Sequence, residues 1–211
     1  PLFCMVMRKH IAGGKIIDIV QPNFERIIIL RIESANEMGD ITTKNLILEI
    51  MGKHSNLILT DETGKILDSI KRVTHEKSSV REVLPGKEYV FPPSQDKKNP
   101  LLAEQADFLF SLHLQEGRRL QEFLYQTYGI SPVMAGEICT RAGLDASDSC
   151  QETTLENSER LFAAFEKTMQ EVKAADFCPA IYYQKENNRI VDFAVLKMQQ
   201  FQGLAAKPFP S

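Results

Sequence analysis

The spacing of apolar residues changes near residue 100, and this change constrains the fold more than any other feature of the sequence. Before it, short β-branched runs alternate with turn residues such as Pro22-Asn23 and Gly64, a pattern typical of strands. After it, apolar residues recur at the i, i+3, i+4 spacing of helices. Strands that follow one another without intervening helices favour an antiparallel sandwich or barrel. The sequence therefore predicts an α+β chain in which an antiparallel β-sandwich precedes a helical domain.

The expected elements can be given bounds. In the first part we expect a helix over 3–12 and strands over 15–20, 26–32, 45–51, 56–60 and 65–70. In the second part we expect helices over 120–128, 132–142 and 154–174, then a hairpin made of 180–184 and 190–198. Ser131 is placed as the N-cap of the middle helix, with Pro132 at its first position. The proline-rich and polar residues 92–99 mark a boundary, which divides the chain into domains 1–98 and 99–211.

Composition limits the class of protein. With 43% hydrophobic and 25% charged residues, the 211-residue chain is ordinary for a globular protein. No apolar run approaches the roughly 20 residues of a membrane span. The net charge of −3 excludes a globally basic nucleic-acid-binding protein. Charge is nevertheless uneven, because residues 1–100 hold 15 basic and 13 acidic side chains while 101–211 hold 10 and 15. A polyanionic partner should therefore meet the first half.

The four cysteines, Cys4, Cys139, Cys150 and Cys178, form no CxxC pair. Cys4 and Cys139 lie within apolar helical patterns, where a free cysteine behaves as a small core residue. No cysteine or histidine pair has the spacing of a structural zinc site. We therefore expect reduced core thiols and no bound metal.

Motifs of catalysis are missing from the sequence. It contains no P-loop, GxGxxG, GxSxG or HExxH. Glu49 lies in a strand before a basic turn, but one carboxylate is a weak case for a general base. Pro1 carries the secondary amine that some glycosylases use as a nucleophile, yet a hydrophobic helix rather than an acid follows it. The sequence predicts a non-enzymatic protein without a cofactor.

Four groups of mostly basic residues could contact nucleic acid, the fourth being Arg26 and Arg31, which flank an apolar strand. Arg8 and Lys9 lie on the polar face of the first helix, and Lys53, His54 and Asn56 lie in a turn between strands. A further group, Lys71-Arg72 with Lys77 and Arg81, follows the hairpin of the first half. Each group alone could equally be a solvated surface. A nucleic-acid surface needs several of them to converge, because each neutralised phosphate adds to the affinity.

Several strings in the sequence resemble the NFACT family, the bacterial group also described as fibronectin-binding-protein-A-like. They lie at residues 3–14, 50–59, 83–86, 129–143 and 179–193. The resemblance implies a β-sandwich similar to that of formamidopyrimidine-DNA glycosylase, here truncated at its start. It also implies a helix-hairpin-helix region around 129–143 and a strand pair after it.

The resemblance further implies a role in ribosome quality control. Members of the family bind the large ribosomal subunit that carries an obstructed peptidyl-tRNA, recruit alanyl-tRNA and support the addition of C-terminal alanine. This implies a cytoplasmic tRNA- and rRNA-binding module of translation. The tRNA-recruiting residues are an Asp-Arg dipeptide, and Glu25-Arg26 occupies that place here. Arg26 matches, whereas Glu25 is longer by one methylene. The alternative for this pair is an ion pair at a strand end, worth about 0–1 kcal/mol.

Two other functions remain as alternatives. A DNA-glycosylase-like nucleic-acid-binding protein is favoured by fold analogy alone, which is a weak argument for function. A fibronectin-binding surface adhesin is suggested by the older name of the family, although the chain has neither a sorting signal nor a Ser/Pro-rich stalk.

Overall fold

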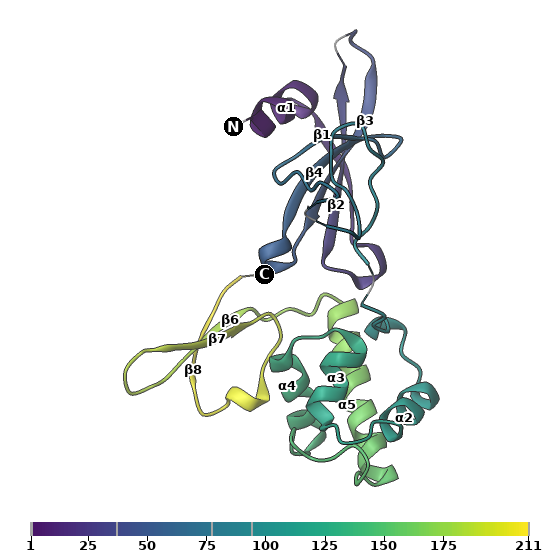
Figure 1. The fold of residues 1–211 in the computed structure, drawn as a ribbon. Helices are drawn as coiled ribbons and strands as arrows, with labels where there is room; N and C mark the ends of the chain where they lie inside the picture. The colour runs from purple at the N-terminus through teal and green to yellow at the C-terminus, as the bar shows by residue number, and fades with distance from the viewer. Residues whose placement is uncertain (1, 37, 77, 94, 211) are drawn as a thin grey trace. The chain divides into compact units, whose positions relative to one another are not determined.

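The computed structural model describes residues 2–36, 38–76, 78–93 and 95–210, and the chain divides into two units, Pro1–Gln95 and Asp96–Ser211. We call them the sheet unit and the helical unit (Figure 1). The chain is mixed α+β with an antiparallel sheet, which confirms the predicted class at this level. Pro1, where a nucleophile was considered, and Lys77 of the third basic group lie outside the described residues.

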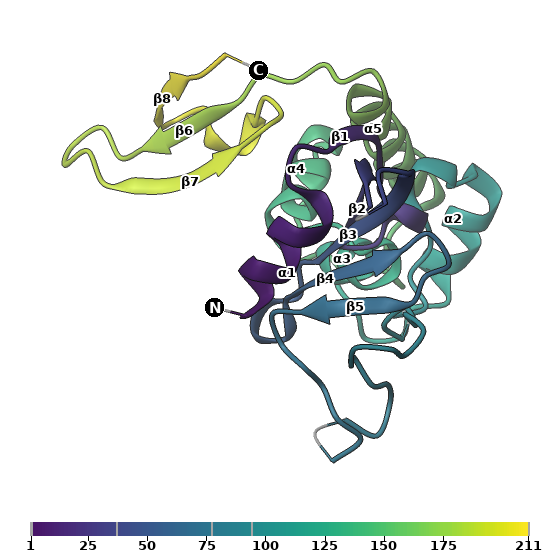
Figure 2. The ribbon, with the colours of Figure 1, turned by 90° about the horizontal axis from the view of Figure 1, so that it is seen from above.

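The sheet unit is a five-stranded antiparallel meander in which neighbours in sequence are neighbours in the sheet. Its elements are α1 (Leu2–Ile11), β1 (Lys15–Val20), β2 (Ile27–Ala35), β3 (Ile41–Glu49), β4 (Asn56–Asp61) and β5 (Ile66–Ser69). Figure 2 shows β2 to β5 side by side, with α1 next to them. The predicted helix and five strands are confirmed. The strand predicted over 45–51 begins four residues earlier and ends two earlier, because Ile41 to Lys44 also pair with β2.

The two faces of the sheet are covered by different parts of the chain. Alternate residues of β3 point to opposite faces, as the pleat requires. Leu46 belongs to the cluster under α1, which also contains Phe3 and Ile32. Ile47 belongs to a second cluster, in which Val83 of the segment after β5 covers the sheet.

The second sheet of the expected sandwich is not formed by the described residues of the sheet unit. The described residues within 70–93 cover that face without regular strands. The isolated bridge Val73↔Val83 closes this segment on itself, and Lys65↔Glu88 joins it to the chain before β5. Pro85-Gly86 and Pro92-Pro93 explain this outcome, because proline cannot donate to a ladder and a central strand does not tolerate it.

The helical unit contains four α-helices among its described residues. They are α2 (Gln105–His113), α3 (Leu120–Tyr128), α4 (Pro132–Ala142) and α5 (Leu155–Lys173). Their inward faces share one core around Phe108, whose ring lies 5.1–5.6 Å from four other aromatic rings. Ser131 caps α4 as predicted, since its Oγ accepts from the Met134 amide at 3.1 Å. Gly143 ends that helix at φ 68°, in the region that favours glycine.

The expected terminal hairpin is part of a larger sheet. β6 (Ala180–Tyr183) pairs with β7 (Ile190–Ala194), and β8 (Ala205–Pro208) pairs with the other edge of β6. The predicted hairpin is confirmed by the pairing of β6 with β7, but the sequence did not predict β8 as a third strand. Pro208 makes this segment a poor strand by sequence, but a proline is acceptable on an edge strand.

The cysteines also differ from expectation. Cys139 and Cys150 are buried, whereas Cys4 and Cys178 are exposed. The inward stripe of α1 contains Phe3 with the i+3 and i+4 positions, and Cys4 falls beside this stripe. The expectation that Cys4 is a core residue was therefore wrong, and the oxidation state of the four thiols stays a prediction.

Candidate nucleic-acid interface

The strand register brings three segments to one end of the five-stranded sheet. Ile27 at the start of β2 pairs with Glu49 at the end of β3, and Glu49 pairs with Asn56 at the start of β4. The Ile50 amide donates to the Arg26 carbonyl at 2.8 Å, which extends this pairing beyond the strands. Ile70, just after β5, donates to Leu57 at 2.9 Å. We call this edge the basic end of the sheet, defined by Arg26, Lys53, His54, Lys71 and Arg72.

The turn that leads into β2 holds Glu25 and Arg26 at this end. Pro22–Phe24 forms a 3-10 turn, and Asn23 and Phe24 both have positive φ, 50° and 58°. Positive φ is unusual for a bulky residue such as phenylalanine and marks a strained backbone. The Glu25 amide donates to the Pro22 carbonyl at 2.9 Å, which fixes where the extended chain begins again.

The side chain of Glu25 is half-buried and that of Arg26 is exposed. Within the described residues, neither the Glu25 carboxylate nor the Arg26 guanidinium has an ion pair or hydrogen bond. The alternative of a strand-end ion pair is thus not formed there. An arginine held at the end of a sheet without a protein acceptor can donate to a phosphate or a base edge.

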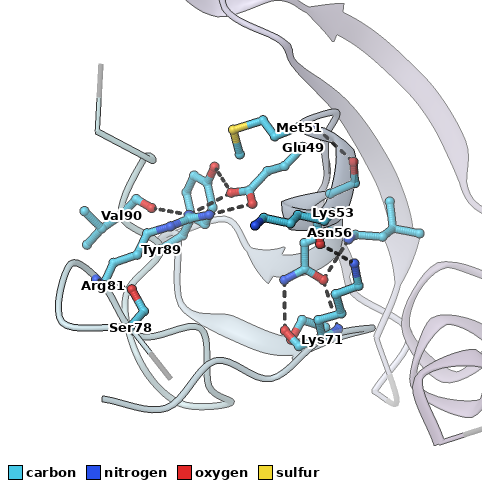
Figure 3. Close-up of polar contacts among 12 residues, drawn as sticks. Glu49, Met51, Lys53, Asn56, Lys71, Ser78, Arg81, Tyr89 and Val90 are labelled. Atoms are coloured by element: carbon cyan, nitrogen blue, oxygen red, sulfur yellow. Dashed lines mark hydrogen bonds and ion pairs between the residues drawn. The ribbon is translucent and has the colours of Figure 1, made fainter. Parts of the chain in front are cut away.

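A second turn places Lys53 and His54 beside this point. Gly52–His54 forms a 3-10 turn between β3 and β4, and both Lys53 and His54 are exposed. The turn is closed by Ser55, whose Oγ accepts from the Met51 amide at 2.9 Å (Figure 3). Both side chains can therefore meet a partner from solvent.

Asn56 has a different place from the one expected. Its Nδ2 donates to the Lys71 carbonyl and its Oδ1 accepts from the Lys71 amide, each at 2.9 Å. The Lys71 ammonium in turn donates to the Lys53 carbonyl at 3.1 Å (Figure 3). The Asn56 amide thus clamps the segment after β5 against the turn before β4. A contact between Asn56 and nucleic acid stays a prediction, and the two hydrogen bonds to Lys71 engage its side chain within the protein.

A buried ion pair lies beneath the basic end. The Glu49 carboxylate is fully buried and binds the Arg81 guanidinium through two bonds of 2.7 and 2.6 Å. Tyr89 donates its hydroxyl to Glu49 at 2.9 Å, and Arg81 also donates to the Val90 carbonyl at 2.8 Å (Figure 3). A buried carboxylate is acceptable only with such partners. This cluster pins Arg81, Tyr89 and Val90, which follow β5, to the sheet.

The pKa shifts agree with this structural role. Burial by itself lowers the pKa of Arg81, but the hydrogen bonds and charge of Glu49 outweigh it, so the pKa is raised. Burial, followed by the charge of Glu49, raises the pKa of Tyr89. Both side chains keep their protons, and the Arg81 charge is neutralised inside the protein. Arg81 therefore does not belong with Lys71 as a contact for a polyanion, although the sequence grouped them. Arg72 is also partly neutralised, because its Nε donates to the buried Asp68 carboxylate at 3.0 Å.

The first basic group lies elsewhere. Arg8 and Lys9 are exposed near the end of α1, and the neighbouring His10 carbonyl accepts from Ser34 Oγ at 2.6 Å. Ser34 lies near the far end of β2, eight residues from Arg26, which corresponds to about 26 Å of extended strand. The structure thus brings Arg26 together with Lys53 and His54 but keeps Arg8 and Lys9 at the opposite end of the sheet.

Sequence reasoning missed Arg81 and Tyr89 as the partners of Glu49. A signal existed, since Glu49 follows Ile47 at the inward-facing position of a strand, where a charge needs a buried partner. Nothing in the sequence marks which residue supplies it, because the partners lie 32 and 40 residues away.

The comparison with known families decides where this chain belongs. The family model described as "NFACT N-terminal and middle domains" matches residues 1–211 of this chain. The chain belongs to the NFACT family. This confirms the resemblance seen in the sequence.

The relatives of this NFACT chain include factors of the RqcH type. The Rqc2 homolog RqcH of Bacillus subtilis (strain 168) is 48% identical over 145 residues, which are 68% of this chain and 25% of that protein. The archaeal Rqc2 homolog aRqcH of Methanocaldococcus jannaschii is 25% identical over 218 residues, covering 100% of this chain and 30% of that protein. The chain thus spans less than a third of the length of either relative.

A solved structure supports the fold. The fibrinogen binding protein from Staphylococcus aureus is similar with a TM-score of 0.81 and 35% identity, covering 100% of this chain and 72% of that one.

Among the described residues, no group of three or more His, Cys, Asp or Glu side chains could hold a metal ion. No helix within the described ranges is both long and apolar enough to cross a membrane.

Proposed function

We propose that this NFACT chain is a non-catalytic, cytoplasmic RNA-binding module of a ribosome quality-control factor. It binds tRNA through Glu25 and Arg26, and it docks on a large ribosomal subunit that carries an obstructed peptidyl-tRNA. In that setting it supports the addition of C-terminal alanine to the stalled chain, and alanyl-tRNA is the tRNA that the family resemblance implies. The kinship with RqcH-type proteins supports the role.

The single observation that carries the proposal is the state of Arg26. The guanidinium lies at the basic end of the sheet with no acceptor among the described residues, next to the exposed Lys53 and His54. An arginine without an internal partner can present its fork of donors to a base edge or a phosphate. The neighbouring Glu25 carboxylate can accept from a ribose 2′-hydroxyl, the group that distinguishes RNA from DNA.

The test replaces Glu25 and Arg26 together by alanine. We expect tRNA affinity to fall by about 1–3 kcal/mol, roughly 5- to 150-fold, if Arg26 contacts a base. Stability should change by no more than about 0.5 kcal/mol, since the pair makes no side-chain bonds within the described residues. The measurement is anisotropy of labelled tRNA, with co-sedimentation on large ribosomal subunits assayed in parallel.

Two controls make this test specific. Glu25→Asp keeps the carboxylate and approaches the Asp-Arg pair of the family, so it should bind tRNA at least as well as the unaltered chain. Arg8→Ala/Lys9→Ala removes two cations at the other end of the sheet and should cost less affinity than the Glu25/Arg26 variant. Unchanged tRNA binding in the Glu25/Arg26 variant would refute the role of the pair.

The fibronectin alternative has one observation behind it. Solved structures similar to this chain are titled fibrinogen- or fibronectin-binding proteins. The basic end of the sheet favours an RNA partner over that alternative, because its cations suit a polyanion. Binding of fibronectin that is lost in the Glu25/Arg26 variant, together with unchanged tRNA binding, would reverse this preference.

A further inference from the structure

A groove in the helical unit has features that the basic end of the sheet does not explain. A cavity of about 800 Å³ lies where the end of α4 faces α5 and the segment around Gln199. Small residues, including Gly143 and Ala163, contribute to its lining and leave it open. Its volume is within the range of sites that hold small ligands. It lies at the opposite end of α4 from the turn at Ser131, so it is not the turn between α3 and α4.

Three exposed cations line this α4–α5 groove. Arg160 and Lys167 are seven residues apart on α5, so they lie on one side of the helix about 10.5 Å apart along its axis. Lys197 comes from the segment after β7, and all three side chains are exposed. Over the part of the chain that the structure describes, the ammonium groups of Lys167 and Lys197 have no hydrogen-bond or ion-pair partner.

The position of Arg160 is built by its neighbours. Its Nη2 donates to the Ala142 carbonyl at 2.6 Å, which also satisfies a carbonyl at the end of α4. A Cβ on Gly143 would lie only 2.7 Å from Nη2, so a side chain there would displace the guanidinium. Arg160 Nη1 also donates to Asn157 Oδ1, at 3.4 Å. Arg160 is therefore held at the groove by two bonds, and its three remaining N–H donors have no partner among the described residues.

A second arginine fixes the opposite wall. Arg141 donates to the buried Glu137 and to Glu171, at 2.8 Å each, and to the Lys197 carbonyl at 2.7 Å. Glu137 also accepts from the Gln199 amide at 2.8 Å. These carboxylates neutralise Arg141, and the bonds hold the segment that carries Lys197 against α4. The wall is thus rigid, and Arg141 does not contribute free charge.

We propose that the α4–α5 groove binds the phosphate groups of an RNA strand, as a second contact separate from the basic end of the sheet. Arg160, Lys167 and Lys197 face one carboxylate in the lining that is not engaged with Arg141, that of Asp176. Guanidinium and ammonium groups are the usual partners of phosphate. A strand carries one charge per nucleotide, so cations two helical turns apart can contact different phosphates of it. The inference rests on the proposed function for its class of partner, but on different residues.

An acidic protein segment fits the groove less well. Protein interfaces rely on aromatic and large apolar anchors that enter pockets. No aromatic side chain is among the described residues that line this groove.

The test compares two double variants of the full chain that change net charge equally. Lys167→Gln/Lys197→Gln alters the groove, and Lys173→Gln/Lys185→Gln alters two exposed lysines of the helical unit outside it. The probe is a short, labelled single-stranded RNA, titrated at several salt concentrations. In the groove variant we expect affinity to fall about tenfold and the salt dependence, log K against log salt, to flatten by about 1.4, for two lost phosphate contacts. The control should show little change in either, and both variants should keep the unaltered melting temperature.

An Arg26→Ala arm separates this inference from the proposed function. If RNA binding is lost in the groove variant but not in Arg26→Ala, the result supports the groove as an RNA-binding site and refutes the proposed tRNA site at Arg26. If the groove variant binds RNA as tightly as its control while Arg26→Ala loses affinity, RNA binding by the groove is refuted and the proposed tRNA site is supported.

Two further probes address the other possible ligands of the groove. ATP tests a free phosphate ligand, and polyglutamate tests an acidic chain. If the groove variant loses the binding of ATP or of polyglutamate but keeps its RNA affinity, RNA is not the ligand of the groove.

Discussion

The sheet unit and the helical unit each bury one glutamate against an arginine, but they use the pair over very different distances. Glu49 and Arg81 are 32 residues apart and join a strand to an irregular segment. Glu137 and Arg141 are one helical turn apart, and Glu137 then reaches the backbone near Gln199. In both units the pair fixes a segment outside the α-helices and the sheet strands beside a cationic surface. The comparison indicates that buried charge here positions neighbouring cations and does not itself bind a partner.

The cores of the units differ as well. The helical unit has one aromatic core, whereas the sheet unit has two smaller clusters on opposite faces of the sheet. Truncating the central ring of the single core should therefore cause a large loss in the free energy of unfolding. We expect Phe108→Ala to destabilise the helical unit by about 3–5 kcal/mol, because it leaves a cavity among four rings.

Thiol labelling can measure which of the two units unfolds in the Phe108→Ala variant. Burial raises the pKa of Cys139 to about 12 and that of Cys150 to about 11, so both stay protonated and covered at neutral pH. Both cysteines belong to the core of the helical unit, so their thiols should be labelled much faster in Phe108→Ala than in the unaltered chain. The measurement is the labelling rate as a function of denaturant concentration. The matched control is Ile58→Ala, a fully buried residue of the sheet unit. If Ile58→Ala exposes these two cysteines equally, the units unfold together and the division into independent domains is wrong.

Removing each arginine sharpens the comparison of the two buried pairs. Among the described residues, Arg81→Ala leaves the fully buried Glu49 with Tyr89 as its one side-chain donor, so we expect a loss of about 3–5 kcal/mol. Arg141→Ala should cost about 1–2 kcal/mol less, because the amides of Gln199 and Gln200 still donate to Glu137.

Urea unfolding of both arginine variants measures this order. The double variant Glu49→Leu/Arg81→Leu removes the charge together with its partner, and it should recover much of the stability lost in Arg81→Ala. An equal loss in Arg81→Ala and Arg141→Ala would show that the backbone donors of Glu137 do not matter.

Much of the fold could be predicted because local patterns specify it. The stripe that starts at Phe3 and the N-cap Ser131 each use neighbours within one or two helical turns. The helix α2 was not individually predicted, since Phe110 is 66% exposed and only Phe108 and Leu112 of this helix are buried. The irregular cover of the sheet and the third strand at the C-terminal sheet depend on pairing with distant residues, which a periodic pattern does not encode.

The candidate site was less predictable than the fold. Glu25 and Arg26 came from the family resemblance, and no spacing or composition singles them out. The turn at Lys53 and His54 was visible as a polar stretch between strands, but its position next to Arg26 depends on the register of β2 with β3. The roles of Asn56 and Arg81 depend on contacts across the fold, so the sequence grouped them with the exposed cations.

The smallest predicted effect concerns the turn between α3 and α4. Ser131→Ala removes the bond from the Met134 amide to Ser131 Oγ, and it leaves this unpaired amide at the start of α4 without its cap. We expect a loss of about 1 kcal/mol in urea unfolding of the helical unit, well below that of Phe108→Ala, because solvent can partly replace an exposed cap. Ser131→Asp should restore this stability, since its carboxylate can also accept from the amide and is favourable at a helix N-terminus. Thr154→Ala, at the equivalent cap of α5, should cost a similar amount, because Thr154 Oγ1 accepts from the Asn157 amide in the same way. A loss far above 2 kcal/mol in Ser131→Ala alone would mean that the turn, and not only the cap, depends on this hydroxyl.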